Sequence, residues 1–183
     1  MSSNVIKNND EVIADKGKNL LKRIPTKKNR KHVENALEYS IKTHEGQVRK
    51  SGLPFVSHCI DVANILIDWN MDHTTVVSAL LHDVVEDTEV KLSDIEEEFG
   101  SDVASLVDGV TKVENIAFRS KEHKQAKNFT KLFLSLARDL RVIIIKFADR
   151  LNNMETIQYL SSNKRKEIAV SYTHLTLPTT GVV

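Results

Sequence analysis

The stretch LLHDVVEDT, residues 80–88, is the most informative part of this chain because it joins an apolar run to a cluster of polar side chains. The run VVSALL, residues 76–81, is typical of a helix buried in a core. His82 and Asp83 follow it directly, and two further acids come within the next turn. A buried helix that ends in a histidine and three acids predicts a polar site at its end.

Two residues of the same chemical kinds lie far from this stretch along the chain. His58 stands in FVSHCIDVA, residues 55–63, and Asp149 stands in IIIKFADRLNNM, residues 143–154. Two imidazoles and two carboxylates from separate helices can converge on one divalent ion and leave room for water or substrate oxygens. Taken singly, His58 can face solvent, Asp83 can be a surface acid, and Asp149 can pair with a neighbouring arginine.

The order H…HD…D resembles that of the HD metal-dependent phosphohydrolases. Longer blocks are similar to the hydrolase domain of the RelA/SpoT family, which makes and destroys the alarmone (p)ppGpp. The similar blocks are HEGQVRKSG (44–52), HDVVEDT (82–88), VDGVTK (107–112) and KFADRLNNM (146–154). The resemblance extends from about residue 28 to residue 169 and implies an all-α fold, the HD-domain helical bundle.

The resemblance also implies the site residues. It assigns one divalent ion, Mn²⁺, to His58, His82, Asp83 and Asp149. Ligation by nitrogen and oxygen without thiolate suits manganese, iron, zinc or magnesium, so the residue types alone do not choose the metal.

Glu86 and Asp87 are the catalytic pair that the resemblance implies. They follow His82 and Asp83 at a spacing of four, so both carboxylates lie beside the metal if the helix continues. A carboxylate there can orient water or take its proton. The alternative is a merely acidic helix end, which the helix dipole disfavours at a C-terminus.

The reaction implied by the resemblance is hydrolysis of the 3′-pyrophosphate of ppGpp or pppGpp in the stringent response; ppGpp gives GDP and pyrophosphate. Arginine can stack on a base and chelate phosphate, whereas lysine acts as a point charge. Lys112 and Lys146 are weaker phosphate candidates, and a solvated loop is the alternative for residues 49–50. The nucleotide contacts implied are Arg49, Lys50, Ser51, Asn153 and Thr156.

Two other functions stay open. The chain can be an HD phosphohydrolase that acts on another nucleotide, although the RKSG loop and the ADRLNNM helix disfavour this. It can also be a regulatory, hydrolase-like domain of an alarmone synthetase, although the HD ligands and the acidic pair are all present. The first of these would be a stand-alone protein, whereas the family resemblance implies synthetase and regulatory domains in the full-length chain.

Composition indicates an ordinary globular domain. The chain has 183 residues and a net charge of +1, which gives no reason to expect nucleic acid or a membrane as a partner. The single cysteine, Cys59, excludes an internal disulfide and stands where family members usually have proline. No apolar signal region opens the sequence, so we expect a cytoplasmic protein.

Apolar periodicity predicts a series of helices. Residues 1–25 are polar and end in a basic segment, so we expect a flexible leader there, with at most a short helix over 18–23. Residues 142–145 have strand propensity, but the spacing of Phe147, Leu151 and Met154 favours helix. The helices expected over the hydrolase domain, residues 26–169, are 29–44, 57–69, 72–83, 93–100, 102–111, 120–138 and 140–160.

The last segment, VSYTHLTLPTTGVV (170–183), has no helical pattern and is rich in threonine. Part of it resembles one reading frame of a transposon-derived sequencing adapter. We therefore expect residues 170–183 to be non-native and the domain to be truncated on its C-terminal side. A genuine β-prone tail is the alternative.

Overall fold

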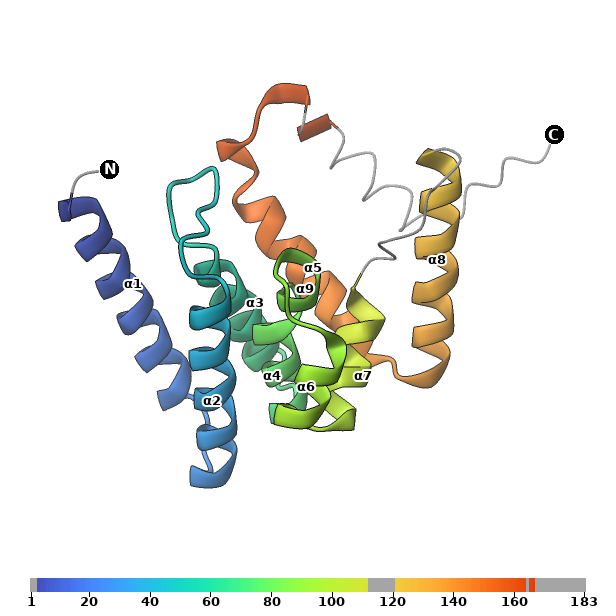
Figure 1. Ribbon diagram of the computed structural model, residues 1–183, viewed down its shortest axis with the longest axis horizontal. Helices are drawn as coiled ribbons and strands as arrows, with labels where there is room; N and C mark the ends of the chain where they lie inside the picture. Colours follow the sequence, from blue (N-terminus) through green and yellow to red (C-terminus); the bar gives the residue numbers. More distant parts are fainter. Residues whose placement is uncertain (1–2, 112–120, 164, 167–183) are drawn as a thin grey trace.

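The computed structural model describes residues 3–111, 121–163 and 165–166. All regular elements within these ranges are helical, as predicted, and the one β-bridge joins Val48 to Pro54. Figure 1 shows the helices side by side, from α1 at one edge to α8 at the other. The elements are α1 (Ser3–Lys22), α2 (Lys27–Thr43), α3 (Val56–Asp68), α4 (His73–Leu81), α5 (Val84–Asp87), α6 (Leu92–Phe99), α7 (Ser101–Val110), α8 (Lys121–Arg138), α9 (Arg141–Glu155) and the 3₁₀ turn η1 (Ile157–Tyr159).

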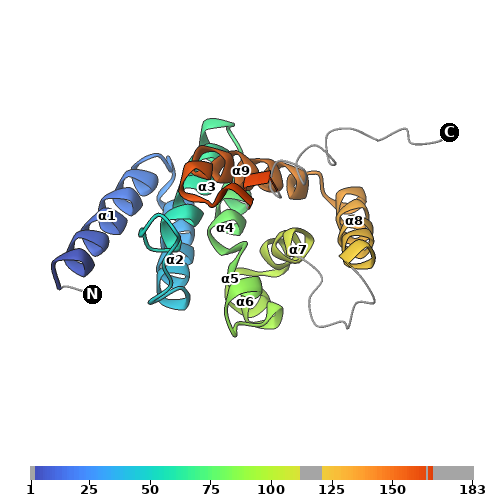
Figure 2. The ribbon, with the colours of Figure 1, turned by 90° about the horizontal axis from the view of Figure 1, so that it is seen from above.

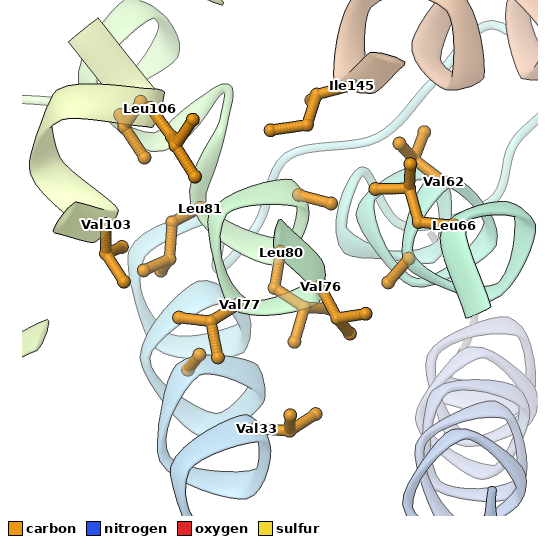
Figure 3. Packing of buried hydrophobic residues seen from close by; sticks show 14 of the residues in the cluster. Val33, Val62, Leu66, Val76, Val77, Leu80, Leu81, Val103, Leu106 and Ile145 are labelled. Carbon is orange, nitrogen blue, oxygen red and sulfur yellow. The ribbon is translucent and has the colours of Figure 1, made fainter. Parts of the chain in front are cut away.

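The centre of the core is α4, the apolar run of the deciding stretch. Its residues from Thr75 to Leu81 are all buried. Figure 3 shows its side chains meeting those of α2, α3, α7 and α9, represented by Val33, Val62, Val103 and Ile145. A helix that is apolar on every side is stable only when it is surrounded in this way. The end of α4 is therefore fixed from all directions, which matters for the site there.

Only the first end of α4 follows from local sequence. The Asp72 carboxylate accepts a hydrogen bond from the backbone N–H of Thr75 at 3.1 Å, so it caps the helix. At the other end the helix stops at Leu81, and His82 and Asp83 lie in a turn before α5. The helix therefore breaks at the HD pair instead of continuing through it.

The flexible leader expected over residues 1–25 is wrong for most of its length, because Ser3–Lys22 form α1. Leu20 is fully buried in the core. Lys16 Nζ lies 2.6 Å from an Asp61 carboxylate oxygen, and Arg23 pairs with Asp68, so charged groups tie this end of the chain to α3. This helix has few apolar residues, so apolar periodicity did not predict it. Tertiary contacts stabilise it instead.

Two serines that stand where the sequence pattern predicts a helix N-cap, Ser57 and Ser93, do not serve as caps. Ser57 does not cap α3, which begins at Val56 after Phe55 and has no side-chain cap. The box expected at Ser93–Glu96 is displaced, because α6 begins at Leu92 and the Asp94 carboxylate accepts the Lys91 N–H at 2.9 Å. In both cases the N-cap lies two residues earlier than the capping pattern predicts, at Phe55 and Lys91.

Gly109 lies inside α7 without interrupting it and lets α7 approach its neighbours. A Cβ at this position would lie 2.6 Å from Val142 Cγ2 on α9 and 3.2 Å from Ser135 Cβ on α8. Val142 is β-branched and buried, so it has little freedom to move away. Glycine is therefore required here for packing.

We expect Gly109→Ala to lower the free energy of unfolding by about 1–3 kcal/mol, the usual cost of overpacking a core. This cost should exceed the gain of about 1 kcal/mol in helix propensity. Gly17→Ala is the matched control, because its new Cβ would meet only the movable end of Leu37. Urea denaturation measures both variants, and equal stabilities for the two would contradict this account of Gly109.

The segment with strand propensity is helical, as predicted, and forms the first half of α9. Among the described helices, none is both long and apolar enough to cross a membrane. Lys112 and residues 170–183 lie outside the described residues, so the expectations about them stay predictions.

Candidate metal centre and nucleotide site

The predicted metal ligands come from three parts of the fold. His58 lies in the first turn of α3, His82 and Asp83 lie in the turn after α4, and Asp149 lies in α9. Helix α9 packs against both α3 and α4, and Figure 2 shows it lying over α3. The packing of these helices therefore brings together residues that are 91 positions apart, from 58 to 149.

The side chains converge closely. Nitrogen and oxygen atoms of His58, His82 and Asp149 all lie within 4.8 Å of one another. Asp149 Oδ1 is 3.2 Å from His58 Nε2 and 3.9 Å from His82 Nε2. Asp83 Oδ2 is 3.1 Å from His82 Nε2 and 3.7 Å from His58 Nε2. Three of the four predicted ligands thus form one close group, and Asp83 lies against both imidazoles of that group.

Hydrogen bonds behind the imidazoles direct their Nε2 atoms toward the carboxylates. His58 Nδ1 lies 2.7 Å from Asn152 Oδ1, and His82 Nδ1 lies 2.8 Å from the Ala79 carbonyl. Because both partners are oxygen acceptors, each Nδ1 carries the hydrogen and donates it. A metal-binding histidine is usually oriented through its other ring nitrogen in this way.

The surroundings of His82 Nε2 provide the best test of whether a metal ion fits this site. This atom is buried and makes no hydrogen bond, although Asp83 Oδ2 lies nearby. A buried polar atom without a hydrogen-bond partner is costly. A divalent ion bound by the two imidazoles and the two carboxylates would give His82 Nε2 a partner. Nitrogen and carboxylate oxygen donors of this kind suit such ions. The residues present therefore fit a metal.

The pKa values of the groups in this cluster are shifted because acidic and basic side chains lie close together and away from water. Burial opposes a charge on His82, but Asp83 and Asp149 outweigh it and raise the pKa of His82 to about 9. Burial likewise opposes ionisation of both aspartates. At Asp83 the His82 imidazole contributes most in the other direction, and the pKa of this carboxyl is lowered on balance. At Asp149 the hydrogen bond with His58 contributes most in the other direction, and the pKa of this carboxyl is lowered as well. The carboxylates are therefore ionised at neutral pH, as metal ligands must be.

The acidic pair lies on α5, a single turn that restarts the helix after the HD break. A backbone hydrogen bond connects α5 to that break, because the Asp87 N–H donates to the Asp83 carbonyl at 2.8 Å. Glu86 is half-buried, whereas Asp87 is exposed and lines a cavity of about 560 Å³. The backbone of the pair is therefore tied to the HD turn, although by a broken helix instead of the continuous one considered above.

A chain of hydrogen bonds connects the RKSG loop to the metal cluster. Arg49 donates to Asn153 Oδ1 at 2.6 Å, and Asn153 Nδ2 donates to Asp149 Oδ1 at 2.7 Å. The Arg49 guanidinium also lies 6.0 Å from the centre of the Phe55 ring, within cation–π range. Two of the predicted nucleotide contacts, Arg49 and Asn153, are thus next to each other and to a predicted ligand.

The other predicted nucleotide contacts are less closely gathered. Lys50 is exposed, and Ser51 Oγ accepts the Leu53 N–H within the loop at 3.5 Å. The Thr156 hydroxyl donates to the Asn152 carbonyl at the end of α9 at 3.0 Å. Lys146 is near enough that its charge lowers the pKa of Asp83 and Asp149. Lys146 is therefore a stronger candidate for a phosphate contact than the sequence alone indicated.

Sequence reasoning missed residues that orient the predicted ones. Asn152 is 3% exposed and holds His58, but its neighbour Asn153 was the one singled out. Helical phase is the only sequence signal that separates these two asparagines. His44 lies outside the group of potential ligands, but it is buried and contacts Gln47.

Comparison with known proteins bears on this arrangement. Residues 36–175 match the family model described as HD domain, which is most of the chain. The chain belongs to the HD domain family. Within that family, it resembles the hydrolase domains of RelA/SpoT proteins, as the blocks around the site residues predict.

Individual relatives agree with this placement. A guanosine-3′,5′-bis(diphosphate) 3′-pyrophosphohydrolase of Haemophilus influenzae is 47% identical over 126 residues, or 69% of this chain and 19% of that protein. The bifunctional (p)ppGpp synthase/hydrolase SpoT of Escherichia coli is 48% identical over 126 residues, or 69% of this chain and 18% of that protein. The HD domain described here therefore spans about a fifth of the length of these relatives.

A solved structure is similar along most of its length. It is described as a metazoan ortholog of SpoT that hydrolyzes ppGpp. The two chains are 31% identical, the match covers 80% of this chain and 82% of the other, and the TM-score is 0.65. A domain of nearly this size can therefore stand as a separate protein with this fold.

Proposed function

We propose that this chain hydrolyses the 3′-pyrophosphate of guanosine 3′,5′-bis(diphosphate) and releases GDP and pyrophosphate. The observation that carries the proposal is the convergence of His58, His82, Asp83 and Asp149 beside the Arg49–Asn153 pair. The side chains of Arg49 and Asp149 both hydrogen-bond to Asn153, which supports a nucleotide site beside the proposed metal ligands. The relatives named for this hydrolysis support the choice of substrate.

The proposed metal is one Mn²⁺ ion held by His58, His82, Asp83 and Asp149. When bound, such an ion polarises phosphoryl oxygens and lowers the pKa of water. The donor atoms support a divalent ion in general, and the choice of manganese rests on the family resemblance. Metal analysis after loading with competing divalent ions would test the choice.

The proposed roles of Glu86 and Asp87 are to orient the attacking water and accept its proton. The oxygen of that water bonds to the phosphorus, and the bond from phosphorus to the 3′ oxygen breaks. The 3′ oxygen then takes a proton and leaves as the hydroxyl of GDP. A positioned carboxylate commonly contributes about 10²–10⁴-fold to such proton transfers.

The proposed nucleotide contacts are Arg49, Lys50, Ser51, Asn153 and Thr156. Arg49 can offer its planar face to the base or two donors to phosphate, both of which suit a densely charged nucleotide. Its hydrogen bond to Asn153 fixes the guanidinium near the metal cluster. Lys146 adds a positive charge near Asp83 and Asp149, where it can attract a phosphate.

We expect Arg49→Ala to raise the KM for ppGpp by about tenfold or more, because loss of a charge-assisted contact costs about 1.5–3 kcal/mol. Arg49→Lys should raise it less, since the charge is kept but the planar geometry is lost. Steady-state kinetics measure both, with the exposed Arg138 replaced by alanine as a control. An unchanged KM in both Arg49 variants would remove Arg49 from the nucleotide site.

Other domains are proposed for the full-length protein, since the relatives are much longer and one is named as a synthase/hydrolase. We propose that the hydrolase domain extends here to about residue 169, where it is truncated on its C-terminal side. We also propose that it begins with α1 instead of residue 26, because α1 packs on α3. Residues 170–183 are proposed to lie outside the domain. The family match ends at residue 175, within that segment.

Turnover of a nucleotide panel tests the substrate. The metal-loaded chain should hydrolyse ppGpp and pppGpp, while GTP, GDP and deoxynucleoside triphosphates should be poor substrates. Equal kcat/KM for all of them would favour the alternative, an HD phosphohydrolase of another nucleotide. Tight ppGpp binding without turnover would favour a regulatory, hydrolase-like domain.

A further inference from the structure

Gln47 lies at the start of the RKSG loop and connects that loop to the catalytic turn. Its side-chain nitrogen donates to the backbone carbonyl of Asp87 at 2.9 Å. Its side-chain oxygen lies 2.9 Å from His44 Nδ1. Its own backbone is fixed as well, because its N–H donates to the His44 carbonyl at 3.0 Å and its carbonyl accepts the Phe55 N–H at 2.9 Å. One side chain thus spans 40 positions of sequence, from 47 to 87.

The chemistry of the partners fixes how these groups are oriented. A backbone carbonyl only accepts, so the Gln47 amide nitrogen must face Asp87. The amide oxygen then faces His44, whose Nδ1 must carry the hydrogen. His44 is 3% exposed and its ring packs on Phe55, with 4.8 Å between ring centres. Turning Gln47 away would leave a buried donor without an acceptor, so His44 holds the amide in place.

Asp87, which accepts the hydrogen bond from Gln47, lies in a short helix. Helix α5 has four residues, Val84–Asp87, and follows the break in the helix at His82 and Asp83. A single turn is not stable by itself, so contacts from outside set its position. The Gln47 amide supplies such a contact at the last residue of the turn, which is also one of the proposed catalytic carboxylates.

We propose that Gln47, held by His44, is a positioning residue that sets the place of Asp87 and of the catalytic turn relative to the nucleotide loop. The proposal rests on the proposed function, because it requires that Asp87 takes part in hydrolysis. It assigns a role to two residues that neither bind the metal nor belong to the nucleotide contacts above. It also explains why a buried histidine stands just before the RKSG loop.

Gln47→Met tests the link, because methionine has a similar length but cannot donate to Asp87. We expect kcat for ppGpp to fall about tenfold, equivalent to about 1.4 kcal/mol, which is the scale of one hydrogen bond. KM and bound metal should stay within about twofold of the parent chain, because neither the nucleotide contacts nor the ligands are altered. Gln158→Ala, at an exposed glutamine on η1, is the control and should match the parent.

His44→Phe is the second variant, because phenylalanine keeps a ring against Phe55 and removes only the donor. It should lower kcat in the same direction as Gln47→Met and by less, about threefold, since the direct link to Asp87 is kept. Circular dichroism on both variants checks that they are folded at the assay temperature. Parent-like kcat in a folded Gln47→Met would overturn the proposal.

A double-mutant cycle separates positioning from general stability. In an Asp87→Asn background, Gln47→Met should cost less than about twofold, because there is no longer a catalytic carboxylate to place. A loss that stays near tenfold in that background would mean that Gln47 acts on folding, and would contradict the proposal. If Asp87→Asn alone left kcat unchanged, the proposed role of the acidic pair would fail, and the positioning role with it.

Discussion

Asp149→Ala should abolish both metal retention and hydrolysis. The carboxylate is one of the groups that meet at the cluster, 3.2 Å from His58 Nε2, and it also accepts the amide of Asn153. Loss of an outer partner of a metal ligand typically weakens metal binding by about 10–100-fold, so loss of a ligand should weaken it by more than about 100-fold. Metal content after gel filtration and turnover of ppGpp measure the two effects.

Asp149→Asn separates the charge from the shape. Asparagine keeps an oxygen that can accept from Asn153, but it lacks the negative charge that a divalent ion requires. We expect it to lose the metal nearly as completely as Asp149→Ala while keeping the parent melting temperature of the metal-free chain. Asp102→Ala, at an exposed acid on α7, is the control. A stoichiometric ion and full turnover in Asp149→Ala would remove Asp149 from the metal site.

Glu86→Gln should lower kcat by roughly 10²-fold or more, while metal content stays near that of the parent chain. Glutamine keeps the size of the side chain but cannot accept a proton from water. The residue is half-buried on the turn that follows the HD pair. The proposed function makes it a catalytic group and not a metal ligand.

Glu89→Gln provides a neighbouring control for this variant. Glu89 is exposed and lines the same cavity as Asp87, but it lies beyond the catalytic turn. It should keep the parent kcat. Loss of the ion in Glu86→Gln would make Glu86 a ligand, and an unchanged kcat would remove it from the chemistry.

The fold could be predicted from apolar periodicity where helices are long and strongly patterned. The run ending at Leu81 gave the central helix, and the continuation past residue 145 correctly excluded a strand. The stripe used for that second argument is not the face that packs, however. Phe147, Leu151 and Met154 are 41–47% exposed, whereas Ala148 is buried. Periodicity indicated the helix but not which neighbours would cover it.

The site could be anticipated only in part. The order of His58, His82, Asp83 and Asp149 predicted a cluster, and packing of α9 on α3 and α4 brings these residues together. The break after Leu81 could not be predicted, because nothing in the local sequence stops the helix. Hydrogen bonds between distant segments, such as the one from Gln47 to the Asp87 carbonyl, have no sequence pattern at all.

The most direct test of the central claim is the identity of the products. The metal-loaded chain is incubated with ppGpp, and phosphorus NMR follows the products with and without a chelator. The account predicts GDP and pyrophosphate in equal amounts, formed only while the metal is bound. Removal of a 5′ phosphate, release of single phosphates, or equal turnover in the presence of the chelator would contradict it.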